Sequence, residues 1–546
     1  MSNNGAAVIP AHRGASGPPL RKALAQNALV HGPILRTLLR LAWPNVLALS
    51  AGTCVVIAET SYIGRLGVES LAAMALVFPF VILTMTMSGG AMGGGVASSI
   101  ARALGAGDVE RASTLAAHAL VIGVCFGLTF MLFMLIFGPH LLEVLGGRGN
   151  VLAQAIGYVQ IFFGGAVLPW VMNTMAGILR GTGNMKLPST MILNSAVCQI
   201  ILGGTLGLGL GPIPQFGMRG VAAGSLTAYL ISISVMSWYL FSGRARVVPR
   251  IRGLRIQGAM FFDILKVGAV SCFSPLQSVL TISIFTHMLA QFGTAILAGY
   301  GIGARLEFML TSVAFSVGIA SVPMIGMSIG ARQIARARRI AWTAGLISFL
   351  SVGLVATVIA IFPDLWVRIF THDESVRQAS RLYLSTAAPC YAFIGLAMSM
   401  YFSSQGAAKV IGPVLAQSAR LVFIGLGGWY LQAHGATATS FFVLAASSMV
   451  VLGVLSTSSV VLTRWGPRHE TATAMPPVLS AAAGGMIERG RRFMIVNRRR
   501  RRWLLPPPKL AIFIIGPIML MIWPMLAPPV MPETSPPPYP PGMPPP

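Results

Sequence analysis

Charged residues are scarce in this sequence, and acidic residues are the scarcest. Only 10% of the 546 residues are charged, whereas 55% are hydrophobic and the mean hydropathy is +0.75. A soluble globular domain carries roughly 25% charged residues. The composition therefore excludes a soluble enzyme, a disordered chain and a secreted disulfide scaffold, and it indicates an integral membrane protein with many spans.

The sequence also lacks the motifs of several other functions. Its five cysteines lie singly in apolar stretches, so neither a disulfide framework nor a zinc site is predicted. The glycine-rich runs SGGAMGGG (88–95) and GGTLGLGLG (203–211) lack the Lys-Ser/Thr ending of a phosphate loop, and we attribute them to close helix packing or hinge bending. We expect no bound cofactor and no metal, and residues 1–33 show no cleavable signal peptide.

Long apolar segments recur along most of the chain. Each is long enough to cross a bilayer, and each is continuous rather than alternating, which indicates helices and not the strands of a barrel. The segments are 41–63, 71–98, 113–138, 154–179, 187–210, 218–242, 264–290, 295–322, 340–363, 382–404, 411–432 and 438–463. The sequence thus predicts an all-α polytopic membrane protein with twelve transmembrane helices.

Basic residues outnumber acidic ones, 39 to 13, for a formal net charge of +26. In a soluble protein this excess would suggest a nucleic-acid partner, but here the basic residues lie in short loops between apolar segments, so the expected partner is membrane lipid. Lysine and arginine near one set of span ends exceed those near the other set about threefold. We therefore predict that both ends of the twelve-span body are cytoplasmic.

The two halves of the chain resemble each other. With a shift of 224–226 residues, GRLGVESLAA (64–73) aligns with AQFGTAILAG (290–299), and ALGAGDVERA (103–112) aligns with SIGARQIARA (328–337). Each half has six spans, so both insert in the same orientation and should be related by a pseudo-twofold axis along the membrane normal. In secondary transporters with such parallel repeats, the substrate site lies between the halves.

The repeat divides the chain into segments with distinct expected roles. The predicted segments are a flexible cytoplasmic N-terminus (1–35), an N-lobe of six transmembrane helices (36–242), a basic cytoplasmic linker (243–263), a C-lobe of six transmembrane helices (264–465) and a basic, then proline-rich tail (466–546). Within the tail, residues 510–526 are apolar but interrupted by Pro517 and Pro524. This segment could be an extra span or an interfacial segment.

Several loop motifs resemble those of the multidrug and toxic compound extrusion (MATE) family of antiporters. They are ETSYIGRLG (59–67), ALGAGDVERA (103–112), RGTGNMKLP (180–188), GARLEFML (303–310) and SIGARQIARARR (328–339). The resemblance implies a V-shaped pair of six-helix lobes in the cell inner membrane. It also implies a monomeric transporter, not an enzyme, that exports amphipathic, often cationic small molecules in exchange for H⁺ or Na⁺.

Glu59 is the strongest candidate for a functional residue, because it is the only charge in the first span. An ionised carboxylate facing lipid costs a few kcal/mol, so Glu59 should face a cavity or carry a proton. The resemblance implies an acidic residue, usually Asp, at this point of the span, with a role in cation coupling. The alternative is a carboxylate near the outer interface that pairs with Arg65. Gln199 and Gly203 stand where some family members carry Asn and Asp, so the Asp is missing here, but Gln199 could still form a hydrogen bond with Glu59.

Further candidates for a substrate or ion pathway lie in the C-lobe. Arg305 and Glu307 are two residues apart in an otherwise uncharged stretch, so they should not face each other on a helix. They form either a polar site or a structural ion network. Gln277 lies where sodium-dependent members of the family carry a carboxylate, which disfavours a sodium site here. His287 could titrate near neutral pH, although a single histidine in a helix is more often packed and hydrogen-bonded.

Three other functions fit the sequence less well. A lipid-linked oligosaccharide flippase of the same superfamily is the nearest alternative, but it would need a strongly cationic cavity. A polytopic enzyme would show clustered Asp, Glu or His at one membrane face. A channel would show repeated filter-like loops.

Overall fold

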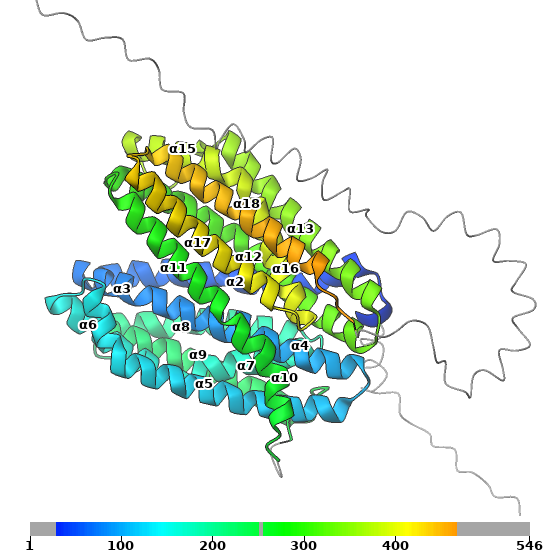
Figure 1. Ribbon diagram of the computed structural model, residues 1–546. Coiled ribbons are helices and arrows are strands. Elements are labelled where there is room, and N and C mark those ends of the chain that lie inside the picture. The colour runs from blue at the N-terminus through cyan, green and yellow to red at the C-terminus, as the bar shows by residue number, and fades with distance from the viewer. Residues whose placement is uncertain (1–28, 251–254, 467–546) are drawn as a thin grey trace, which may run out of the picture. The chain divides into compact units, whose positions relative to one another are not determined.

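The apolar segments form helices because a helix satisfies its own backbone hydrogen bonds in a medium without water. The computed structural model describes residues 29–250 and 255–466, and every regular element in these ranges is helical (Figure 1). Eleven helices in these ranges are long and apolar enough to cross a membrane, or twelve if α6 and α7, bent by 45°, count as one span. The predicted all-α polytopic fold is confirmed. Residues 510–526 lie outside the described ranges.

The N-lobe contains nine helical elements. They are α2 (Ile34–Arg65), α3 (Val68–Met85), the π-helical segment η1 (Thr86–Met92), α4 (Gly93–Gly105), α5 (Val109–Val144), α6 (Gly149–Gly164), α7 (Val167–Gly181), α8 (Lys186–Leu208) and α9 (Gly217–Phe241).

The linker and the C-lobe contain ten helical elements among the described residues. They are α10 (Gly258–Ser271), α11 (Phe273–Ala290), α12 (Thr294–Gly330), α13 (Ile334–Ile361), α14 (Asp364–Val367), α15 (Glu374–Ala387), the 3₁₀ turn η2 (Ala388–Cys390), α16 (Tyr391–Gly406), α17 (Ile411–Ala433) and α18 (Ala438–Leu462).

The parallel repeat is visible in the backbone of the turns. Four pairs of positions, related by the sequence shift, have a positive φ in both halves of the chain. The pairs are Gly67 and Gly293, Gly107 and Arg332, Gly183 and Ala408, and Gly209 and Gly435. Arg332 and Ala408 of the C-lobe thus adopt a backbone conformation that favours glycine. The same turns in the same order show that both halves follow one chain path.

The seventh span is divided between the two lobes. Its first part, α10, packs on the N-lobe, where a Cβ atom on Gly95 would lie 2.6 Å from the backbone nitrogen of Gly268. Its second part, α11, packs on the C-lobe, where Gln277 donates a hydrogen bond to Ser418 of α17. Figure 1 shows α10 beside the blue and cyan helices and α11 continuing into the green-to-orange group. The break at Cys272 therefore joins segments that belong to different lobes.

An ionic cluster holds α10 on the N-lobe. The Asp263 carboxylate of α10 lies 3.1 Å from Arg102, 3.3 Å from Arg111 and 2.5 Å from Lys266. Arg102 is largely buried, so the Asp263 carboxylate compensates a charge that has little access to water. This cluster lies at the end of the helices that carries most loop arginines, which we call the arginine-rich end (residues 102–111, 180–186, 244–250, 255–266 and 332–339).

The lobes are in backbone contact near the arginine-rich end. A Cβ atom on Gly105 of α4 would lie 2.2 Å from the carbonyl oxygen of Met327, and one on Gly330 of α12 would lie 2.1 Å from that of Arg102. Gln405 of α16 also crosses the interface, where its side-chain amide donates to the carbonyl oxygen of Gly90 at 3.2 Å. Glycine at these positions lets α4 and α12 approach closely.

Candidate functional site

Glu59 lies inside the N-lobe and not on its lipid-facing surface. Its side chain is 6% exposed and projects from α2 toward α8, where the amide of Gln199 donates a hydrogen bond to Oε1 at 2.7 Å. Isolated polar residues on neighbouring membrane helices pair in this way because lipid offers no other partner. The contact expected between Glu59 and Gln199 is therefore present.

The Glu59 carboxyl has no cationic partner in the part of the chain that the structure describes. Among residues 29–250 and 255–466, no ion pair includes Glu59, and Arg65 is exposed at the end of the same helix. The alternative interpretation, a carboxylate paired with Arg65, is therefore not observed. A carboxyl group whose only hydrogen-bond partner is a neutral amide can exist with or without a proton, because no fixed charge determines its state.

Three buried tyrosines on different helices lie within electrostatic range of this carboxyl. They are Tyr62 of α2, Tyr158 of α6 and Tyr229 of α9. The Tyr62 hydroxyl is buried and has no hydrogen-bond partner in the described part of the chain. The cluster is thus polar but not fully satisfied, which leaves a donor and acceptor available for a water molecule or an ion.

Gly203 makes room for one of these tyrosines. A Cβ atom added at Gly203 would lie 2.7 Å from the Tyr62 hydroxyl oxygen. The Tyr62 hydroxyl therefore occupies the space into which a side chain at position 203 would project. A second carboxylate next to Glu59 is not compatible with this arrangement, so Glu59 is the single acid of the cluster.

In the C-lobe, Gln277 belongs to a hydrogen-bonded interface between α11 and α17. Its amide donates to Ser418 at 2.5 Å, while Gln417 donates back to Ser278 at 2.9 Å. The amide oxygen of Gln277 is buried and has no partner among the described residues. The α11–α17 pair corresponds to the α2–α8 pair of the N-lobe, but it carries neutral groups where the N-lobe carries Glu59.

Arg305 and Glu307 have separate environments. The Arg305 guanidinium is exposed and lies 5.4 Å from the centre of the Phe370 ring. Glu307 is partly buried and lies within electrostatic range of Arg420 of α17, although no ion pair joins the two in the described ranges. Arg420 instead donates to Ser448 at 3.4 Å. The two residues, close in sequence, therefore do not form one site.

His287 belongs to neither group, because its side chain is exposed on α11. Within the described ranges, no group of three or more His, Cys, Asp or Glu side chains could hold a metal ion. The candidate site therefore consists of Glu59, Gln199 and the three tyrosines, and the C-lobe contributes a separate pair, Glu307 and Arg420.

A family model matches the chain in two segments, residues 44–205 and 271–431, and its description is MatE. The two matched segments are of nearly equal length, and each covers spans from one lobe, so the family unit itself is repeated. The chain belongs to the MatE family. The resemblance to MATE antiporters is therefore confirmed, and this MatE chain is a multi-pass membrane protein of a transporter family.

Curated relatives of this MatE chain are transport proteins of bacteria. A Shewanella oneidensis protein named "FAD transporter" is 24% identical over 406 residues, which cover 73% of this chain and 88% of that protein. A Thermotoga maritima protein named "Probable multidrug resistance protein NorM" is 22% identical over 391 residues, which cover 70% of this chain and 82% of that protein. Such relatives support an efflux role in general but differ in the substrates that their names state.

Solved structures share the fold of this MatE chain. A MOP superfamily transporter from Pyrococcus furiosus superimposes with a TM-score of 0.74 at 23% identity, covering 80% of this chain and 97% of that one. The bent form of the Vibrio cholerae MATE transporter VcmN superimposes with a TM-score of 0.71 at 22% identity and the same coverage. At these identities the likeness establishes the twelve-helix fold alone.

Arg420 and the tyrosines are residues that sequence reasoning did not place in a site. Arg420 is the only charge in the segment 411–433, and this isolation was the available signal. Tyr62, Tyr158 and Tyr229 come from three different spans, so nothing in their sequence spacing indicates that they meet.

Proposed function

We propose that this protein exports amphipathic organic cations in exchange for H⁺, and that Glu59 is the group that couples the two movements. The observation that supports the proposal is the environment of Glu59, a buried carboxyl with one neutral hydrogen-bond donor and no ion pair among the described residues. A carboxylate in such a place attracts a cation, and protonation removes that attraction. Proton and cationic substrate would thus compete for the same negative charge.

The position of α2 supports a route from Glu59 to the interface between the lobes. The segment that leads into α2 contacts the C-lobe, because Arg336 donates to the carbonyl oxygen of Gly32 at 2.6 Å. The other end of α2 carries Glu59 and its bond to α8 of the N-lobe. A change in the α2–α8 contact on protonation would therefore alter the helix that connects both lobes, and so favour one packing of the lobes over the other.

The energy for this exchange comes from the concentration gradient of H⁺. One H⁺ that enters while one monovalent cation leaves moves no net charge, so the membrane potential does no work on a one-for-one exchange. An inward H⁺ gradient of one pH unit supplies about 1.4 kcal/mol, which corresponds to about a tenfold concentration gradient of substrate.

We further propose that the protein lies in the cell inner membrane with the arginine-rich end in the cytoplasm, and that it works as a monomer without a cofactor other than the coupling ion. The excess of basic residues in the loops at this end supports the orientation. The hydrogen bonds between α11 and α17 in the C-lobe join neutral amides and hydroxyls without a carboxylate. This supports H⁺ over Na⁺, because a sodium site needs several oxygen ligands, usually with a carboxylate among them.

An anionic substrate such as a dinucleotide is a second candidate. The name of the Shewanella oneidensis relative, FAD transporter, favours it. So does Arg180 of α7, which is 5% exposed and whose buried Nε atom has no hydrogen-bond partner among the described residues. A buried guanidinium without a partner is costly, and an anionic group on the substrate would compensate it. A flippase for lipid-linked oligosaccharides would use the same cationic group.

The experiment is efflux from proteoliposomes loaded with ethidium or with FAD, with inward H⁺ and Na⁺ gradients imposed separately. We expect ethidium to leave under the H⁺ gradient and Glu59→Gln to abolish this efflux. Glu69→Gln is the matched control, because Glu69 is an exposed carboxylate at the same end of the N-lobe that is bonded to Asn150. FAD efflux without ethidium efflux would establish the second candidate, and full efflux by Glu59→Gln would refute the role of Glu59.

A further inference from the structure

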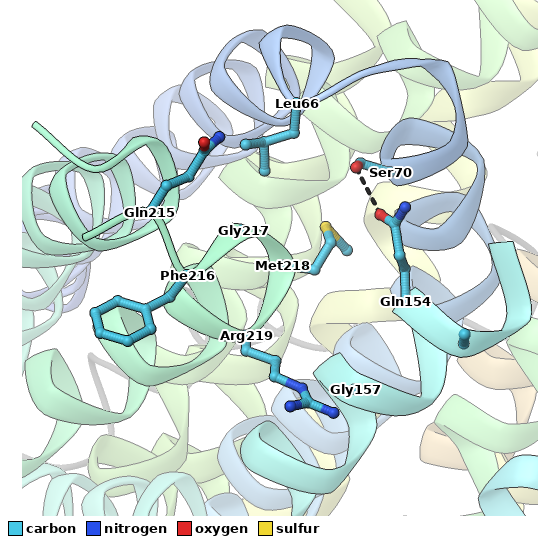
Figure 2. Close-up of a pocket in the computed structure, with 10 residues that line it drawn as sticks. Leu66, Ser70, Gln154, Gly157, Gln215, Phe216, Gly217, Met218 and Arg219 are labelled. Atoms are coloured by element: carbon cyan, nitrogen blue, oxygen red, sulfur yellow. Dashed lines mark hydrogen bonds between the residues drawn. The ribbon is translucent and has the colours of Figure 1, made fainter. Parts of the chain in front are cut away.

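A cavity of 460 Å³ opens at the end of the N-lobe opposite the arginine-rich end (Figure 2). Its walls come from three places in the sequence, namely the turn between α2 and α3, the middle of α6, and the loop that leads into α9. The cavity lies beyond Glu59 along α2, where Leu66 follows Glu59 by seven residues, or about 10 Å of helix rise. It is therefore a separate feature from the Glu59 cluster.

The only charged residue that lines this cavity is Arg219. Its guanidinium makes no hydrogen bond or ion pair with any residue in the described ranges, and no acidic residue lines the cavity. The arginine side chain lies across Gly157 of α6, where an added Cβ atom would be 3.0 Å from Nε (Figure 2). The absence of a side chain at Gly157 thus leaves space for the positive charge at the cavity wall.

A second donor lines another part of the same cavity. The Ser70 hydroxyl donates to the side-chain oxygen of Gln154 at 2.6 Å, which is the dashed line in Figure 2. This bond sets the orientation of the amide, because the oxygen is used by Ser70 and the NH₂ group remains available to donate. The cavity therefore presents a guanidinium and an amide donor without a competing carboxylate.

The rest of the wall is apolar. Leu66 and Met218 line the cavity, and the ring of Phe216 is 53% exposed next to it. A cavity lined by an exposed aromatic ring and by unpaired donors suits a ligand with an apolar body and an anionic group. The cavity volume is in the range of sites for small organic molecules.

We propose that this cavity is a binding site for an organic anion that carries a phosphate or carboxylate on an apolar or aromatic body. Arg219 binds the anionic group, Gln154 donates a second hydrogen bond, and Phe216 contacts the body. Two sources share this chemistry, namely the headgroup region of an anionic lipid and a soluble aryl or alkyl phosphate. The proposal concerns binding alone and does not depend on a coupling role of Glu59.

The test is a calorimetric titration of the full-length protein in phosphatidylcholine nanodiscs with 1-naphthyl phosphate. The matched cation 1-naphthylmethylammonium has the same aromatic body and the opposite charge. We expect the phosphate to bind and the cation not to bind. Arg219→Gln should weaken phosphate binding at least tenfold, and Gly157→Leu, which retains the charge but fills the cavity, should weaken it as well.

Arg65→Gln is the control variant, because Arg65 is an exposed arginine at the same end of the N-lobe that does not line the cavity. The binding constant of Arg65→Gln for 1-naphthyl phosphate should stay within twofold of that of the unsubstituted protein. Repeating the titration with phosphatidylglycerol in the nanodiscs distinguishes the two sources. If phosphatidylglycerol weakens the binding of 1-naphthyl phosphate, and does so only when Arg219 is present, the natural ligand is the lipid headgroup. If phosphatidylglycerol leaves the binding of 1-naphthyl phosphate unchanged, the natural ligand is the soluble anion. Absence of phosphate binding, or equal losses in Arg219→Gln and Arg65→Gln, would overturn the proposal.

Discussion

The contact between Gly105 and the backbone of α12 predicts the effect of adding one methyl group. In Gly105→Ala, the new Cβ atom would lie 2.2 Å from the carbonyl oxygen of Met327 and 2.7 Å from its Cα. Ordinary contacts of this kind begin at 3.4 Å. Both neighbours are backbone atoms, so no side chain can rotate away, and α4 and α12 must separate by roughly 1 Å to relieve the clash.

The expected magnitude follows from the cost of overpacking, which is about 1–3 kcal/mol. Alanine also favours the helix over glycine by about 1 kcal/mol, but this gain is the same whether the lobes are apart or together. The arrangement with the lobes in contact at the arginine-rich end should therefore lose population roughly 5- to 150-fold relative to the alternative.

The assay is pulsed EPR in nanodiscs, with spin labels on Val109→Cys and Ala335→Cys in a background without the native cysteines. Gly105→Ala should move the distance distribution toward longer values. Gly301→Ala is the control, because Gly301 lies on the same helix α12 and nothing lies within 4 Å of its added Cβ atom. A distribution for Gly105→Ala that matches the Gly301→Ala distribution would refute the reasoning.

Three further predictions concern polar contacts. Gln199→Leu removes the hydrogen bond to Glu59, and a hydrogen bond to a charged group is worth about 1.5 kcal/mol. The coupling-ion concentration that gives half-maximal efflux from proteoliposomes should therefore change about tenfold, and an unchanged concentration would contradict this. Asp263→Asn removes the carboxylate that compensates Arg102, so the free energy of unfolding should fall by about 3 kcal/mol in a denaturant titration; equal stability would show that water compensates the arginine. Hydrogen bonds from Arg381 hold the pKa of Asp364 below its usual range in the folded protein. The ionised Asp364 carboxylate therefore stabilises the fold at any pH above its unfolded pKa of about 3.9, and this stabilisation is lost as the pH falls through its pKa in the folded protein. Asp364→Asn should therefore lower Tm at pH 7, and the difference in Tm should shrink progressively as the pH falls below about 3.9; a pH-independent difference would exclude this ion pair as the cause.

The helices and the repeat could be predicted from the sequence because their causes are local. A continuous apolar run must be helical in lipid, and turns that need a positive φ keep glycine in register, as at Gly67 and Gly293. The contact of Glu59 with Gln199 was also predictable, because each is an isolated polar group and the two spans share a lobe. These predictions need no knowledge of how the lobes meet.

Other features depend on packing between distant segments and could not be predicted. The seventh span reads as one apolar run, yet α10 lies on the N-lobe because Gly95 and Gly268 allow the backbones to touch. Glu307 was identified as a candidate, but its partner Arg420 lies more than a hundred residues away and has no motif around it. The space at Gly203 is used by Tyr62, and this arrangement requires the helix crossing and not the sequence alone.

The most direct test of the central claim is the simultaneous measurement of H⁺ entry and ethidium exit in the same proteoliposomes. Coupling through Glu59 predicts that ethidium exit drives a stoichiometric H⁺ entry in the original protein and in Glu69→Gln, and that both fluxes vanish in Glu59→Gln while the variant keeps its thermal stability. Stoichiometric H⁺ entry in Glu59→Gln would contradict the account.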